Sequence, residues 1–165
     1  YASRLRRVSG HPVSLTGAPN FIVIIAGEDG RAEAIKEAAL RVPGIAGPSL
    51  HTLNGMRRNT YCAVAAYVAG TSYSAAVAVI RAEHPDLRRL SCIHEELAQG
   101  LGLSNDSPAA HPSIFNDDDE FALLTRHDEL LLRMLYDPRL HPGMTADQAL
   151  PIASIIAREL IDGVQ

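Results

Sequence analysis

The residues with the clearest chemical potential lie close together in the chain, at Glu95, Glu96, Gln99 and Asn105. Carboxylate and amide oxygens can bind a divalent cation, and a carboxylate beside a bound metal can act as a general base. Glu95 and Gln99 are four residues apart, so on a helix they would lie one above the other. The pattern therefore allows a metal site, and its simpler interpretation is a solvated helix face.

A helix over about Leu87–Leu101 would position these side chains. Its apolar residues recur at steps of three and four, at Leu90, Ile93, Leu97 and Leu101. At 3.6 residues per turn, Glu95 and Gln99 fall on the side opposite this apolar stripe. Cys92 lies on the same side as they do, and Glu96 is adjacent. We therefore expect the polar side chains to face either water or a cleft.

Three strands are predicted from continuous apolar runs, at Phe21–Ala26, Tyr61–Val68 and Tyr73–Ala82. The turn residues Gly70-Thr71-Ser72 predict that the last two strands form an antiparallel hairpin. Capping residues and periodicity predict three further helices, over about Arg31–Val42 after an Asp29 cap, Thr125–Tyr136 and Thr145–Ile161.

The order of these elements indicates one α+β domain over residues 21–165. Residues 1–20 are expected to form an N-terminal arm, with a short strand near Pro12–Leu15. Residues 43–55 are rich in Pro and Gly, so we expect a long loop there.

Residues 95–105 resemble the metzincin signature His-Glu-x-x-His-x-x-Gly-x-x-His, with every His replaced. The resemblance implies that Glu95, Gln99 and Asn105 occupy the positions of the three metal ligands. It also implies that Glu96 occupies the position of the general base, and Gly102 that of the glycine at which the chain turns. Metzincins are zinc peptidases. The implied fold is a zincin-like domain with a mixed sheet packed on an active-site-type helix, followed by C-terminal helices.

Two downstream segments extend this resemblance. Ser113-Ile114-Phe115 is similar to the Met-turn of a matrixin, with Phe115 in place of Met. Residues 124–136 are similar to the matrixin C-terminal helix, at Leu124, Thr125, Asp128, Leu135 and Tyr136. Upstream, strand, helix and sheet come in the order that a zincin domain uses.

A longer block resembles the proteobacterial family DUF2927. It comprises residues 92–107, 113–117, 124–125 and 135–144. That family has no established function and several members look like lipoproteins. The resemblance therefore implies a periplasmic or envelope-associated protein, with a lipid anchor upstream of this chain. Two cysteines alone allow either a disulfide or two buried thiols. The resemblance favours a disulfide between Cys62 and Cys92, because the periplasm is oxidising.

The donor atoms at the ligand positions decide what chemistry to expect. A catalytic zinc site usually takes His, or His and carboxylate, and keeps one position open for water. Gln99 and Asn105 offer only neutral amide oxygens, which suit hard cations such as calcium better than zinc. Without a metal, water keeps its high pKa and Glu96 has little to activate. We therefore expect neither a cofactor nor hydrolysis, with zinc or another divalent cation as the alternative.

The favoured functional hypothesis is a non-catalytic zincin-like domain of the bacterial cell envelope that binds a protein or peptide. The first alternative is an active metallopeptidase with an atypical metal site at Glu95, Gln99 and Asn105 and with Glu96 as its base. The second is a structural accessory subunit of an envelope complex.

Composition excludes other classes of function. The formal net charge is −4, the pI is about 5.9, and no basic stripe is interleaved with aromatic residues, so nucleic acid is not an expected partner. No apolar run approaches the roughly 20 residues of a membrane helix. The chain begins at Tyr1 without Met or a signal peptide, so we expect a processed or trimmed form.

Three other polar features have interpretations of their own. His94 would open a different metal motif, but Ala98 stands at its second ligand position, so His94 is interpreted as a packed or hydrogen-bonded histidine. His111 is near enough in sequence to Asn105 to reach a cleft. The acidic run 116–120 lacks the alternating ligands and glycine of an EF-hand loop, which favours a solvated loop over a calcium site.

Overall fold

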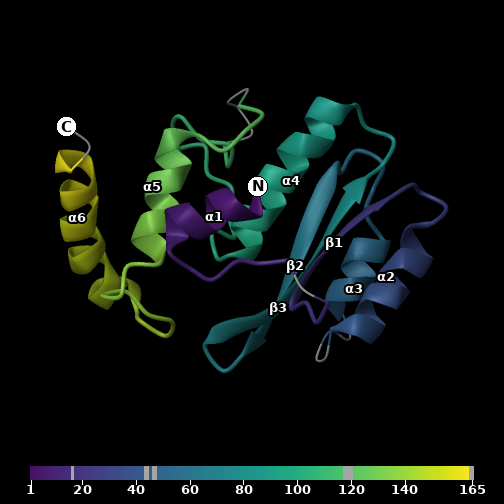
Figure 1. The fold of residues 1–165 in the computed structure, drawn as a ribbon, viewed down its shortest axis with the longest axis horizontal. Coiled ribbons are helices and arrows are strands. Elements are labelled where there is room, and N and C mark those ends of the chain that lie inside the picture. Colours follow the sequence, from purple (N-terminus) through teal and green to yellow (C-terminus); the bar gives the residue numbers. More distant parts are fainter. Residues whose placement is uncertain (16, 43–44, 46–47, 117–120, 164–165) are drawn as a thin grey trace. The chain divides into compact units, whose positions relative to one another are not determined.

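The computed structural model describes residues 1–15, 17–42, 45, 48–116 and 121–163. Within this part of the chain there are six helices and one three-stranded mixed sheet, which confirms the predicted α+β class (Figure 1). The chain divides into two compact units. We call residues 15–105 the sheet unit, and residues 1–14 with 106–165 the helical unit.

The sheet consists of β1 (Phe21–Ala26), β2 (Cys62–Ala69) and β3 (Ser72–Arg81), in the order β1-β3-β2. β1 runs parallel to β3, and β2 runs antiparallel to β3. All three predicted strands and the hairpin are confirmed, with bounds within one residue. Gly70 takes the positive φ of 65° that the tight turn between β2 and β3 requires.

Helices cover both faces of β3, which explains the continuous apolar run at residues 75–80. Residues 75–80 are each at most 5% exposed. On one face, Ile24, Val77 and Val79 form a core with α2 (Arg31–Arg41) and α3 (Pro48–Asn54). On the other face, α4 (Asp86–Gly100) packs against β2 and β3. Figure 1 shows α2 and α3 side by side, with the sheet between them and α4.

Helix α3 lies in the segment predicted to be a long loop, so that prediction was wrong for residues 48–54. Leu53 is almost fully buried in the core, and Leu50 packs against it. Burial of two leucines three residues apart therefore outweighs the Pro and Gly content of the segment. The predicted Asp29 cap was also wrong, because α2 has Gly30 at its N-cap and no side-chain cap.

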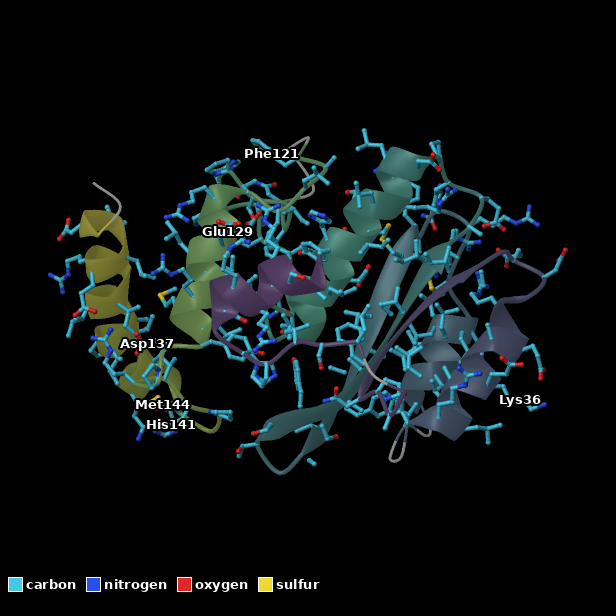
Figure 2. The ribbon with its side chains drawn as sticks, viewed as in Figure 1. Lys36, Phe121, Glu129, Asp137, His141 and Met144 are labelled. Atoms are coloured by element: carbon cyan, nitrogen blue, oxygen red, sulfur yellow. A yellow bond between two sulfur atoms is a disulfide. The ribbon has the colours of Figure 1, made fainter. Side chains whose placement is uncertain are left out.

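The helical unit comprises α1 (Ala2–Ser9), α5 (Arg126–Leu135) and α6 (Ala146–Asp162). α1 lies in the predicted N-terminal arm, and residues 12–15 form no strand, so the short strand expected there was wrong. Leu5 of α1 is 1% exposed, so burial of this side chain stabilises the helix. Arg4 Nε donates to Glu129 Oε1 of α5 at 2.8 Å, and Figure 2 labels this glutamate.

Both predicted capping boxes are confirmed. Thr125 and Asp128 cap α5 reciprocally, and Thr145 and Gln148 cap α6 in the same way. Pro151 lies inside α6, as the sequence indicates. No helix in the described residues is both long and apolar enough to cross a membrane.

An exposed ionic network joins the α5–α6 connection to α6. Arg139 donates to Asp137, labelled in Figure 2, and to Glu159. Side-chain hydrogen bonds from Arg139 lower the pKa of Asp137 to about 2 and also lower the pKa of Glu159. Replacing Arg139 with Gln is expected to return the pKa of Asp137 towards its ordinary value near 4, as measured by NMR titration of its carboxyl carbon.

The same network sets a pH dependence of stability. Because the pKa of Asp137 is lower in the folded chain, its contribution is present above the unfolded pKa and is lost as pH falls through about 2. In the Arg139→Gln variant, the free energy of unfolding should therefore fall less between about pH 4 and pH 2 than it does in the wild type. Arg126→Gln is the control, because Arg126 pairs with Glu129 instead. An unchanged titration of Asp137 in the Arg139 variant would contradict the assignment.

Candidate functional site

Helix α4 is fixed to the sheet at two points. Near its middle, Cys92 forms a disulfide with Cys62, the first residue of β2, which confirms the pairing that the family resemblance favoured. At its C-terminal end, a Cβ added to Gly100 would lie 2.4 Å from Cε1 of Phe21 and 3.4 Å from Cγ2 of Val64. The backbone of α4 therefore approaches the sheet so closely at residue 100 that only glycine fits without a shift of Phe21.

These two points define the side of α4 that faces the sheet. Glu96 lies four residues after Cys92 and four residues before Gly100, so it shares that side with both. Glu96 is only 2% exposed, whereas Glu95 and Gln99 are half-buried. The solvated-face interpretation is therefore wrong for Glu96.

The two carboxylates lie against the disulfide. One oxygen each from Glu95 and Glu96 and the sulfur of Cys62 all lie within 4.8 Å of one another. The residues come from two elements, β2 and α4, and both belong to the sheet unit. Sequence reasoning assigned Cys62 to a disulfide alone. A usable signal was present, because Glu95 and Glu96 follow Cys92 by three and four residues, the spacings that share a helix face.

The metzincin resemblance placed Gln99 and Asn105 at the other two metal-ligand positions. Gln99 is half-buried on α4, and Asn105 is exposed beyond the end of the helix. Gly102 has a positive φ of 124°, and its N–H bonds to the carbonyl of Gln99 at 2.9 Å, so the chain leaves the helix there. His94 is buried, in line with its interpretation as a packed histidine.

In the helical unit, Ser113-Ile114-Phe115, which was predicted to resemble a Met-turn, is buried around Asp128. Ser113 Oγ donates to Asp128 Oδ1 at 2.6 Å, and the Ile114 N–H donates to Oδ2 at 3.2 Å. Phe115 is 3% exposed. His111 is exposed, beside the Asn116 amide group. Residues 117–120 of the acidic run lie outside the described residues.

A buried arginine pair in the sheet unit was not predicted. Arg31 and Arg81 are 6% and 5% exposed, and both donate to Glu28. The hydrogen bond from Arg81 is the main reason that the pKa of Glu28 is lowered. Arg81 also donates to the backbone carbonyls of residues 56, 57 and 60. These bonds hold the segment between α3 and β2, so the pair has a structural role.

Comparison with known proteins identifies one family. A family model described as "Protein of unknown function (DUF2927)" matches residues 1–154. No curated protein and no solved structure matches the chain.

Proposed function

This chain belongs to the DUF2927 family, and we propose that it is a zincin-like domain of the bacterial cell envelope that binds a protein or peptide segment without hydrolysing it. The disulfide between Cys62 and Cys92 supports an oxidising compartment such as the periplasm. The lipid anchor implied by the family resemblance would place the domain at the membrane surface.

The burial of Glu96 is the main observation in support of a domain that does not hydrolyse the peptide. A general base must come within hydrogen-bond reach of the water that it activates. Glu96 stands at the general-base position of the metzincin pattern, yet it faces the sheet and is 2% exposed. The ligand positions also fit zinc poorly, because they combine one carboxylate with two neutral amides.

Two features support the zincin-like frame. In the sheet unit, β1 is followed by two helices, the hairpin and α4, which keeps the general order of strand, helix and sheet that a zincin domain uses. In the helical unit, Asp128 joins the Met-turn-like segment to the helix that resembles the matrixin C-terminal helix. Two segments that share one resemblance are thus connected by hydrogen bonds.

The sheet suggests how a peptide would bind. Within the described residues β2 is an edge strand, paired only with β3. An extended peptide can add to such an edge through backbone hydrogen bonds, with side-chain contacts supplying specificity. The Cys62 end of β2 lies beside the half-buried Glu95. A Lys or Arg side chain of the peptide would pair with Glu95 there.

Binding of labelled ten-residue peptides, measured by fluorescence anisotropy, tests the proposal. Peptides of high β-propensity that carry Lys or Arg should bind, and Glu95→Lys should weaken binding by about tenfold or more. Glu33→Lys is the matched control, since Glu33 is an exposed glutamate on α2. The peptides should remain intact with zinc present. Peptide cleavage with stoichiometric zinc, abolished by Glu96→Gln, would overturn the proposal in favour of a metallopeptidase.

A further inference from the structure

We propose that Cys62, Cys92, Glu95 and Glu96 form a zinc site when the disulfide between the two cysteines is reduced. The site differs from the metzincin positions, because Gln99 and Asn105 take no part in it. The zinc site does not depend on the proposed peptide binding, because it requires only its own four ligand residues and their geometry.

The geometry is close to what zinc requires. Two atoms bound to one tetrahedral zinc ion lie about 3.3–3.8 Å apart, given Zn–O of about 2.1 Å and Zn–S of about 2.3 Å. The Cys62 sulfur and one oxygen from each glutamate already lie within 4.8 Å of one another. The Cys92 sulfur is bonded to the Cys62 sulfur, so it lies next to this group, and reduction leaves the two sulfurs free to separate.

The donor set suits zinc chemically. Thiolate sulfur and carboxylate oxygen are both common zinc ligands, and four such donors complete a tetrahedral site. Cys92, Glu95 and Glu96 lie on one side of α4, and the disulfide fixes β2 beside them. Two carboxylates held this close repel each other, so a divalent cation between them is favourable. Cys62 is half-buried, which leaves a route for a reductant and for the ion.

The chemistry balances with a dithiol as reductant. The dithiol gives two electrons and two protons to the disulfide and is itself oxidised to a disulfide. The bond between the Cys62 and Cys92 sulfurs breaks, leaving two thiols. Zinc then replaces the two thiol protons, which pass to solvent. Because zinc binds only the reduced form, it shifts the equilibrium towards reduction.

The test is to measure cobalt and zinc binding to the whole chain in its oxidised and reduced forms. The reduced form is prepared with dithiothreitol, which is then removed under nitrogen. The reduced protein should bind one equivalent of Co²⁺ with sulfur-to-metal charge-transfer absorption, and Zn²⁺ should displace it. The oxidised protein should show no such absorption. Cys62→Ser should abolish it, and Glu95→Gln and Glu96→Gln should each weaken zinc affinity by about tenfold or more. Glu37→Gln, on α2, is the control and should bind like the wild type.

If the reduced protein stays folded, either of two results would overturn the proposal. One is a reduced protein that stays folded by circular dichroism and binds neither ion. The other is tight binding that the two glutamate substitutions leave unchanged, which would show that the thiols recruit other ligands. If reduction unfolds the sheet unit, zinc should refold it, because binding free energy then becomes folding free energy. Failure of zinc to restore the far-ultraviolet spectrum would also overturn the proposal.

Discussion

Replacing Asp128 with Ala is expected to destabilise the helical unit by about 3–5 kcal/mol. The carboxylate is fully buried and accepts four hydrogen bonds, from Ser113 Oγ, from the Ile114 N–H, and from both the N–H and the hydroxyl of Thr125. Its loss leaves the buried Ser113 hydroxyl and Ile114 N–H without this acceptor and also removes the capping box of α5. The chain has no Trp, so unfolding in urea is best followed by circular dichroism.

Asp147→Ala is the matched control, because Asp147 lies in the first turn of α6 but is exposed. It should cost at most about 1 kcal/mol, the usual value of an acidic residue near a helix N-terminus. Hydrogen exchange should show faster opening of α5 in the Asp128 variant. Equal stability of the two variants would mean that the buried carboxylate does not hold the 113–116 turn to α5.

Replacing Arg81 with Met is expected to destabilise the sheet unit by about 3 kcal/mol. Met keeps most of the apolar volume but cannot donate to the carbonyls of Thr60, Met56 and Arg57. The segment that leads into β2 would then lose its attachment to β3. The pKa of Glu28 should rise towards its ordinary range in the same variant, because the hydrogen bond from Arg81 is what chiefly lowers it.

Arg88→Met is the control for this substitution. Arg88 is exposed and lies over the Tyr61 ring, with its Cζ 4.6 Å from the ring centroid. An exposed cation–π contact of this kind contributes about 0.5–1 kcal/mol. If the Arg81 variant were no less stable than the Arg88 variant, the buried guanidinium would not be a main support of this segment.

Elements with strong local signals could be predicted from the sequence. β1 and β3 are continuous apolar runs, and α5 and α6 begin at capping boxes that need only four adjacent residues. α1 and α3 carry no comparable signal, because they depend on contacts distant in the chain. Leu5 is buried in the helical unit, and Leu53 is buried against β-strands of the sheet unit. Local periodicity cannot report such tertiary burial.

The helix that carries the candidate site was predicted to within one residue, but its buried side was not. The hydrophobic pattern pointed to Leu90, Ile93, Leu97 and Leu101, none of which is fully buried. The sheet-facing side instead carries Cys92, Glu96 and Gly100. A disulfide at Cys92 and a close backbone approach at Gly100 hold that side to the sheet, and neither requires an apolar side chain on α4 at these two positions. Hydropathy is therefore a poor guide wherever covalent attachment replaces hydrophobic packing.

The disulfide also limits how far the chain can be stretched. It joins residues 30 positions apart, so β2, β3 and the first half of α4 lie within a covalent loop. Under a pulling force applied at the two ends, this loop would carry no tension. The oxidised chain would be about 100 Å shorter at full extension than the reduced chain, at about 3.4 Å per residue. A protease or unfoldase that threads the chain through a narrow pore would meet this segment as a double strand.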